Sequence, residues 1–143
     1  MKATSSAAIY WDTSAIVSAL FLDDGSEAAM RCARSSATHL ISSLAWTETH
    51  AVMARIERER ALATVLVEAG REALESGPWR RLKVEPNWKR IKQLARVWPL
   101  RGADLWHLAT AIELQSEIPE LAFFSFDSRL AAAASGEGLK SLT

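Results

Sequence analysis

Short apolar runs that lead directly into helical patterns stand near both ends of the chain. The first run, AAIYWD at residues 7–12, is followed by a helical stretch to about Leu22. The last run, LAFFS at residues 121–125, is followed by the helical stretch DSRLAAAAS at residues 127–135. Strands joined through helices pair in parallel, because the crossover helix returns the chain to the same end of the sheet. These two segments therefore predict an α/β fold.

The same alternation continues through the middle of the chain. Helices are predicted over residues 26–36, 44–60, 61–76, 87–98 and 103–115, and strands over residues 38–41, 80–84 and 139–142. We expect Ser42 or Ser43 to open the helix that follows the second strand, and Pro86 to lie in the first turn of the helix before Trp98. The pattern predicts one domain over residues 1–143, a three-layer helix–sheet–helix sandwich with a mostly parallel five-stranded sheet.

The composition is that of an ordinary globular domain. Apolar residues make up 49% of the chain and charged residues 24%, which excludes intrinsic disorder. No apolar run approaches the roughly 18 residues of a membrane span, and the first acid of MKATSSAAIYWD comes too early for a secretory signal. The single cysteine, Cys32, excludes a disulfide framework and a cysteine-based zinc site, so we expect a cytoplasmic protein without membrane contact.

The formal net charge of zero hides an uneven distribution of charge. Residues 1–77 carry 7 basic and 10 acidic side chains, residues 78–101 carry 8 basic and 1 acidic, and residues 102–143 carry 2 basic and 6 acidic. We call residues 78–101 the basic band. A cationic segment between acidic flanks indicates an anionic partner, although a solvated helix face rich in lysine and arginine has the same composition.

Two acids follow strands that leave the same edge of the predicted sheet. Asp12 ends the first strand and Asp127 comes just after the strand at residues 121–125, and parallel sheets bind ligands outside the carboxyl ends of their strands. Each acid, taken singly, also fits a structural role as a cap. Glu48 lies in a mostly apolar helical stretch with no cation within one turn, and Asp104 lies in a first helical turn, where the helix dipole favours a carboxylate.

Four segments of the chain together resemble the PIN domain, and specifically the VapC-type ribonuclease toxins of bacterial and archaeal toxin–antitoxin pairs. They are IYWDTSAIVSALF, the helix with Glu48, LRGADLWHLATAIEL and FFSFDSRLAAAASGEGL, and they have the order and spacing of the family over essentially the whole chain. The resemblance implies that Asp12, Glu48, Asp104 and Asp127 form the family's acidic cluster. It also implies that Ser125 supplies a hydroxyl where the family often has threonine, that the strand order is 3-2-1-4-5, and that the protein is a homodimer with a cognate antitoxin.

A cluster of carboxylates has a definite chemistry. Carboxylates within a few ångströms repel one another, so they take up protons or hold cations, and an all-oxygen donor set favours Mg²⁺ or Mn²⁺ over zinc. Such a metal lowers the pKa of a bound water and neutralises charge on the leaving oxygen when a phosphodiester is hydrolysed. We predict that Asp12, Asp104 and Asp127 bind the metal directly or through water, and that Glu48 binds it through water or orients the nucleophile.

Four polar side chains near these acids are candidates for binding the substrate. Ser14 can hydrogen-bond a phosphate or a ligand carboxylate, or it can cap its helix. Arg101 and Arg129 flank two of the acids in sequence, where each can clamp a phosphate or form a surface ion pair. Ser125 completes the predicted substrate-binding set.

A histidine and two tryptophans also lie close to the acids in sequence. His107 follows Asp104 by three residues on the same helical face and can approach the site, although a packed helical histidine is commoner than a metal ligand. Trp46 and Trp106 are each two residues from an acid, which turns them about 200° round the helix. We expect both tryptophans to face away from the site, toward the core or a dimer interface, rather than to stack on bases.

The sequence favours a Mg²⁺- or Mn²⁺-dependent endoribonuclease whose partners are an RNA substrate and an antitoxin protein. The alternative from another class is a non-catalytic binding module on the same fold, which would hold a basic peptide on its acidic rim. A metal-dependent phosphatase or DNA nuclease would keep the chemistry and change the substrate. The apolar stretches at residues 16–22 and 52–56 are candidate antitoxin surfaces, or parts of the core.

Overall fold

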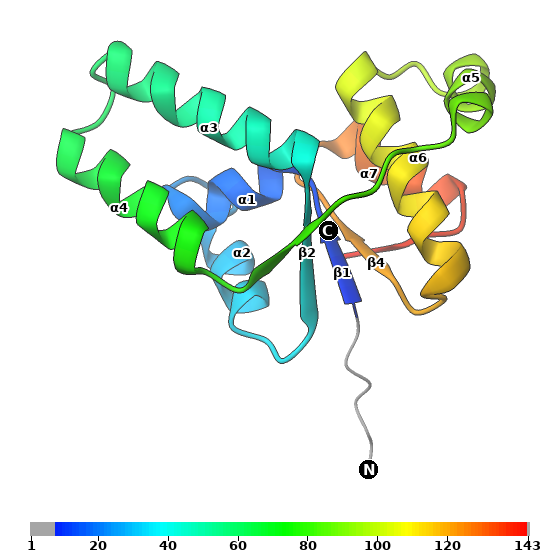
Figure 1. Cartoon of the computed structure of the whole chain (residues 1–143), viewed down its shortest axis with the longest axis horizontal. Coiled ribbons are helices and arrows are strands. Elements are labelled where there is room, and N and C mark those ends of the chain that lie inside the picture. The colour runs from blue at the N-terminus through cyan, green and yellow to red at the C-terminus, as the bar shows by residue number, and fades with distance from the viewer. Residues whose placement is uncertain (1–7, 143) are drawn as a thin grey trace.

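Five parallel strands form the central sheet of the protein, which a computed structural model describes over residues 8–142 (Figure 1). The strands are β1 (Ala8–Trp11), β2 (Thr38–Ser42), β3 (Trp79–Leu82), β4 (Ala122–Phe124) and β5 (Lys140–Ser141). Their order is β3-β2-β1-β4-β5, and every pairing is parallel. The predicted fold class and the strand order 3-2-1-4-5 are confirmed.

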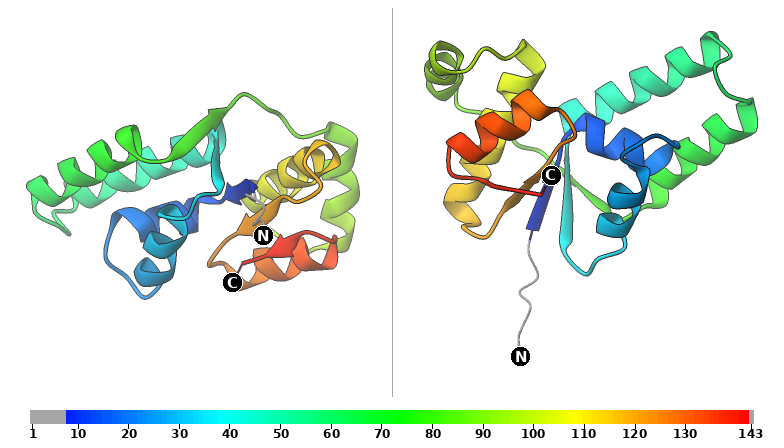
Figure 2. Two further views of the ribbon diagram at one scale, coloured as in Figure 1. Left: turned by 90° about the horizontal axis from the view of Figure 1, so that it is seen from below. Right: turned by 180° about the vertical axis from the view of Figure 1, so that it is seen from behind.

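Helices cover both faces of the sheet (Figure 2). One group consists of α1 (Thr13–Leu20), α2 (Ser26–Ala33), α3 (Ser43–Arg58) and α4 (Thr64–Ser76), and the other of α5 (Trp88–Val97), α6 (Gly102–Glu117) and α7 (Ser128–Gly136). The chain moves from β1 to one edge of the sheet and returns to β4 on the other side of β1, and right-handed crossovers then place the two groups on opposite faces. No helix in the described part of the chain is long and apolar enough to cross a membrane.

Successive residues of β1 build the two hydrophobic cores. Tyr10 packs into the core beneath α5, α6 and α7, where it stacks on Phe123 with ring centroids 5.5 Å apart. Trp11 packs into the core beneath the other four helices, edge-on to Phe124 at 4.7 Å. Both side chains are fully buried because consecutive residues of a strand point to opposite faces and helices cover both.

The structure confirms one predicted helix start and shifts two others. Ser42 is the N-cap of α3, since its hydroxyl accepts from the Ala45 amide at 3.0 Å. Pro86 was predicted in the first turn of α5 but precedes the helix, because Asn87 caps it by accepting from the Arg90 amide. The helix predicted from residue 61 begins at Thr64, after a turn in which Arg60 has a φ of 53°.

Two predicted strands also have boundaries that differ from the structure or lie partly outside it. The predicted first strand included residue 7, which lies outside the described residues, as does the rest of the predicted domain at residues 1–6 and 143. The strand predicted over residues 80–84 begins at Trp79 and ends at Leu82.

Candidate active site

The predicted acids gather where β1 and β4 end side by side. The strands on either side of this point are connected in opposite directions, and this reversal in topology is where open α/β sheets bind ligands. The Asp12 amide donates to the Phe124 carbonyl at 3.1 Å, which ties the ends of the two strands together. Asp12 and Asp127 are the N-caps of α1 and α7. Each acid therefore has the predicted capping role and also lies at this edge of the sheet.

Asp12 is buried, with 3% of its surface exposed, and three donors hold it. The Ala15 amide and the Ser14 hydroxyl donate to Oδ1 at 2.9 and 2.7 Å, and the Ser125 hydroxyl donates to Oδ2 at 2.5 Å. Burial nonetheless raises the pKa of Asp12, and the three hydrogen bonds only oppose that rise. A cation at this edge would therefore stabilise the ionised carboxylate.

Ser14 and Ser125 were predicted to bind substrate, and the structure engages both hydroxyls within the protein. Each donates its hydrogen to Asp12, and each oxygen accepts a backbone amide, from Phe126 at 2.9 Å and from Asp127 at 3.0 Å respectively. The two serines thus join the start of α1 to the loop between β4 and α7. They hold Asp12 in place, and contact between them and substrate stays a prediction.

Asp104 and Asp127 bring two further carboxylates near Asp12. Asp127 uses Oδ1 to accept the amides of Arg129 and Leu130 at 3.0 and 3.1 Å. Asp104 lies in the first turn of α6. Burial raises its pKa, and the negative charges of Asp127 and Asp12 raise it further. Two of the other predicted acids therefore repel Asp104 at this edge of the sheet.

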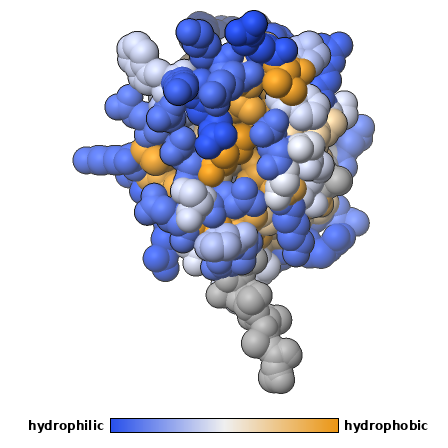
Figure 3. Space-filling model, turned by 90° about the vertical axis from the view of Figure 1, so that its right-hand side faces the viewer, coloured by the Kyte–Doolittle hydropathy of each residue, from blue (hydrophilic) through white to orange (hydrophobic). Residues whose placement is uncertain are grey.

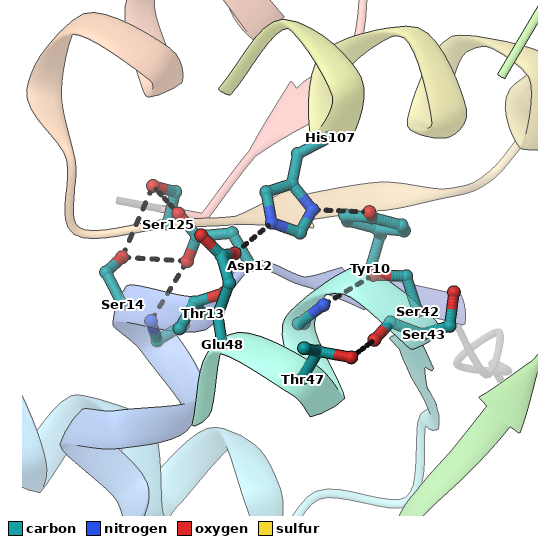
Figure 4. A network of polar contacts seen from close by, with 12 residues as sticks. Tyr10, Asp12, Thr13, Ser14, Ser42, Ser43, Thr47, Glu48, His107 and Ser125 are labelled. Carbon is teal, nitrogen blue, oxygen red and sulfur yellow. Dashed lines mark hydrogen bonds and ion pairs between the residues drawn. The ribbon is translucent and has the colours of Figure 1, made fainter. Parts of the chain in front are cut away.

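Glu48 joins the site through partners on two other helices. Its Oε1 accepts the Thr13 hydroxyl at 2.6 Å and lies 3.1 Å from Nε2 of His107 (Figure 4). The hydrogen bond from His107 lowers the pKa of Glu48, with a smaller contribution from Thr13, while burial acts in the opposite direction. Glu48 has no cation within one turn of α3, and its partner His107 comes instead from α6. The missing local partner therefore correctly indicated that Glu48 has a contact elsewhere in the fold.

His107 and Thr13 are the residues of the site that sequence reasoning placed least well. His107 is 2% exposed and packed, as expected, but it also contacts an acid of the site. Its spacing of three residues from Asp104 was the available signal. Thr13 carried only a helix-capping signal, whereas Asp12 caps α1 and Thr13 donates to Glu48.

The arginines and tryptophans lie at the margin of the site. Arg101 immediately precedes α6, and its charge lowers the pKa of Asp104, although burial and the neighbouring acids outweigh it. Arg129 is exposed in the first turn of α7. Trp46 packs against the core beneath α1 to α4, with the Arg81 guanidinium 4.1 Å from its ring centre, and Trp106 lines a surface hollow with Trp88. Trp46 thus packs against the core as predicted, whereas the Trp106 ring borders the surface hollow and lies edge-on to His107, with ring centroids 5.8 Å apart.

The donor chemistry of this site fits a hard divalent cation. Among residues 8–142, protein donors contact one carboxylate oxygen of Glu48 and one of Asp127, and the other oxygen of each has no donor. Neither oxygen of Asp104 accepts a hydrogen bond from these residues. All these atoms are carboxylate oxygens, the ligands that Mg²⁺ and Mn²⁺ prefer. Within the same described range, no three His, Cys, Asp or Glu side chains stand close enough together to bind one metal directly.

Comparison with known proteins gives a family and a fold. The family model for the PIN domain matches residues 9–136. No curated protein is significantly similar to the chain in sequence. The crystal structure of PAE2754 from Pyrobaculum aerophilum is similar with a TM-score of 0.61 at 14% identity, over 96% of this chain and 85% of that one. The structure of VapBC-1 from nontypeable Haemophilus influenzae is similar with a TM-score of 0.56 at 15% identity, over 94% of this chain and 96% of that one.

Proposed function

The chain belongs to the PIN-domain family, and from that premise we propose that it is a metal-dependent endoribonuclease acting as the toxin of a type II toxin–antitoxin pair. PIN domains are generally nucleases. The observation that carries the proposal is the repulsion of the Asp104 carboxylate by Asp12 and Asp127 near the ends of β1 and β4. Burial raises the pKa of Asp12, and burial together with the neighbouring acids raises that of Asp104, so these two carboxylates would gain from a bound cation.

Asp12, Asp104 and Asp127 would hold Mg²⁺ or Mn²⁺, with Glu48 binding it through water or orienting the nucleophile. When bound, the metal would lower the pKa of a water and neutralise charge on the leaving oxygen of a phosphodiester. Ser14 and Ser125 fix the orientation of Asp12 through both of its oxygens. The remaining residues of the predicted set, Arg101 and Arg129, would contact phosphate oxygens of the substrate.

RNA is the proposed substrate because cations gather on α5, the helix that precedes the helix of Asp104. α5 carries Lys89, Arg90, Lys92 and Arg96 and no acid. Trp88 at the start of α5 is 85% exposed, beside a hollow of about 320 Å³ that includes Trp106. Figure 3 faces the side of the molecule on which α5 lies, where hydrophilic side chains surround smaller apolar patches. Lysine and arginine would bind the RNA backbone, and an exposed tryptophan offers a surface on which a base could stack.

The proposed antitoxin would cover apolar surface on the other group of helices. Leu22 at the end of α1 is 95% exposed, and Val65 and Leu66 on α4 are 73% and 52% exposed. Of the stretches predicted for this role, residues 16–22 divide between core and surface, since Ile16 is fully buried, and Met53 of residues 52–56 is buried. Such side chains would mark a protein contact where they form a contiguous apolar patch. The homodimer and the cytoplasmic location remain proposals of the same kind.

Cleavage of RNA by the purified protein tests the proposal. The wild type should cleave RNA in the presence of Mg²⁺ or Mn²⁺, and Asp12→Asn, Asp104→Asn and EDTA should each abolish the cleavage. Glu117→Gln, at the opposite end of α6 from Asp104, is the matched control and should cleave like the wild type. Expression of the wild type should arrest growth, whereas expression of Asp104→Asn should not. Cleavage that survives Asp12→Asn or EDTA would contradict the proposal.

One observation favours the non-catalytic alternative. In residues 8–142, no three ligating side chains are already grouped to bind a metal. A rim that binds a basic peptide would not require such a group. Titration with Mn²⁺ separates the two functions, because binding that is lost in Asp104→Asn supports the nuclease and absence of any binding supports the binding module. Cleavage of DNA or of a phosphomonoester in place of RNA would keep the chemistry and change the substrate.

A further inference from the structure

His107 joins three separate elements of the fold through a buried hydrogen-bonded chain (Figure 4). Its ring Nε2 lies 3.1 Å from Oε1 of Glu48 on α3, and its ring Nδ1 lies 2.7 Å from the Tyr10 hydroxyl on β1. Both ring nitrogens have a partner, so the ring cannot turn without breaking two contacts.

The partners of His107 decide which ring nitrogen carries hydrogen. The Glu48 carboxylate can only accept, so a hydrogen on Nε2 is needed to make that contact favourable. Burial holds the pKa of Tyr10 far above its usual range, and the phenol therefore keeps its hydrogen and can donate it to Nδ1. The chain of donors then runs in one direction, from Tyr10 through His107 to Glu48.

The same contacts divide the two oxygens of Glu48. Oε1 accepts from both His107 and Thr13, at 3.1 and 2.6 Å, and no group in residues 8–142 donates to Oε2. Two donors from α1 and α6 thus fix one oxygen from different directions. The other oxygen is left for a ligand that the protein itself does not supply.

We propose that His107 is a positioning residue that holds Glu48 as a carboxylate through Nε2–H, so that Oε2 is the oxygen presented to the acidic cluster. The expected effect of His107 on catalysis rests on the proposed nuclease activity. The position of the hydrogen on Nε2 and the orientation of the Glu48 carboxylate do not depend on that activity. Groups that orient the ligands of a metal in this way are commonly worth about 10–100-fold in metal affinity or activity.

His39 provides an internal comparison for His107. Trp11, the neighbour of Tyr10 on the opposite face of β1, donates from Nε1 to Nδ1 of His39 at 3.0 Å. His39 is also 2% exposed, but its Nε2 lies 3.3 Å from the Ser35 carbonyl and contacts no acid. The two histidines are thus equally buried and equally paired to an aromatic donor, and only His107 reaches the site.

The ¹⁵N NMR spectrum of the imidazole rings tests the chain without any assay of activity. The wild type should show His107 with hydrogen on Nε2 and a bare Nδ1. Tyr10→Phe removes the donor to Nδ1, and the hydrogen should stay on Nε2, because the Glu48 carboxylate still accepts it. A wild-type His107 with hydrogen on Nδ1 alone would overturn the proposal.

Three variants at the two histidines test the consequence. His107→Leu should weaken Mn²⁺ binding, measured by calorimetry, and lower kcat for RNA, each by about 10–100-fold, with KM changed by less than about 3-fold. His107→Gln places an amide N–H near the position of Nε2 and should recover most of both values. His39→Gln should leave both values unchanged, whatever it does to the melting temperature.

The failure of the inference is distinct from the failure of the proposed function. If the wild type cleaves no RNA, the nuclease proposal fails, and the tautomer of His107 still decides the positioning role. If His107→Leu folds and matches the wild type in Mn²⁺ affinity and kcat, the inference is wrong. Should His107→Leu not fold, His107→Gln and Tyr10→Phe carry the test, and values for His107→Gln as low as those for Asp104→Asn would overturn it.

Discussion

The Ser125 hydroxyl donates a hydrogen bond of 2.5 Å to Oδ2 of Asp12, across 113 positions of sequence. From the other side, the Ser14 hydroxyl donates to Oδ1 at 2.7 Å. Asp12 is therefore oriented by hydroxyl groups from the ends of two neighbouring strands, although burial raises its pKa. A carboxylate that is costly to ionise and yet held in one orientation is suited to binding a cation.

Removal of the Ser125 hydroxyl should impair the site without unfolding the protein. Ser125→Ala leaves Oδ2 of Asp12 without a donor, and we expect Mn²⁺ affinity and RNA cleavage to fall by about 10-fold or more. Ser116→Ala is the control, because the Ser116 hydroxyl donates to the Glu113 carbonyl of its own helix. Calorimetry with Mn²⁺ measures the effect, and an unchanged affinity in Ser125→Ala would refute the role assigned to this hydroxyl.

Neutralisation of Asp104 should stabilise the metal-free protein. Burial and the charges of Asp127 and Asp12 raise the pKa of Asp104, so the ionised group costs stability at neutral pH. We expect Asp104→Asn to raise the free energy of unfolding at pH 7 in EDTA by about 0.5–1 kcal/mol, a range reduced for partial exposure to solvent. The melting temperature of each protein measures the difference.

The sign of this effect gives its pH dependence. A raised pKa penalises the folded state above that pKa and carries no penalty once pH falls below the unfolded value. The advantage of Asp104→Asn should therefore shrink as pH falls toward about 4 and below. Added Mg²⁺ should stabilise the wild type and leave Asp104→Asn unaffected. A variant less stable than the wild type at pH 7 would argue against repulsion among these acids.

Charges on α5 should govern RNA binding if the basic band binds RNA. Replacement of Lys89, Lys92 and Arg96 by glutamine should weaken RNA binding and reduce its dependence on salt. The slope of the logarithm of the binding constant against the logarithm of the salt concentration should fall by about 0.7 for each phosphate that the variant no longer neutralises. Arg81, another cation of the band, is already engaged with Glu75 at 2.9 Å and is a poorer choice.

A triple variant on the opposite group of helices is the control for α5. It replaces the exposed Arg34, Arg55 and Arg58 by glutamine, which changes the net charge equally. Fluorescence anisotropy of a labelled RNA at several salt concentrations compares the two triple variants. Equal salt slopes in both would mean that α5 is only a solvated face.

Cys32 should react slowly with alkylating reagents. Burial raises the pKa of its thiol to about 11 from 9.0. The thiolate fraction at pH 8 is then about 100-fold below that of an unperturbed cysteine, because reactivity follows the thiolate. Iodoacetamide labelling followed by mass spectrometry should show this slow rate at pH 8 and its rise toward that of a free thiol in denaturant. Fast labelling of the folded protein would contradict the assignment.

Topology made half of the site predictable from local patterns. Asp12 and Asp127 each follow an apolar strand, and parallel pairing alone places both at one edge of the sheet. The partners of Glu48 could not be found this way, because Thr13 and His107 come from α1 and α6. A histidine three residues after Asp104 has the same sequence signal whether it packs or reaches an acid.

The sequence by itself determined the order of strands and helices, the basic band and the four acids, because these follow from side-chain periodicity and residue type. Tertiary structure decided which carboxylate oxygens are occupied by protein donors and which are left for a ligand. Those hydrogen bonds join Ser125 to Asp12 across 113 positions and His107 to Glu48 across 59. Contacts over such separations depend on how the helices cross the sheet, and no local pattern of residues encodes them.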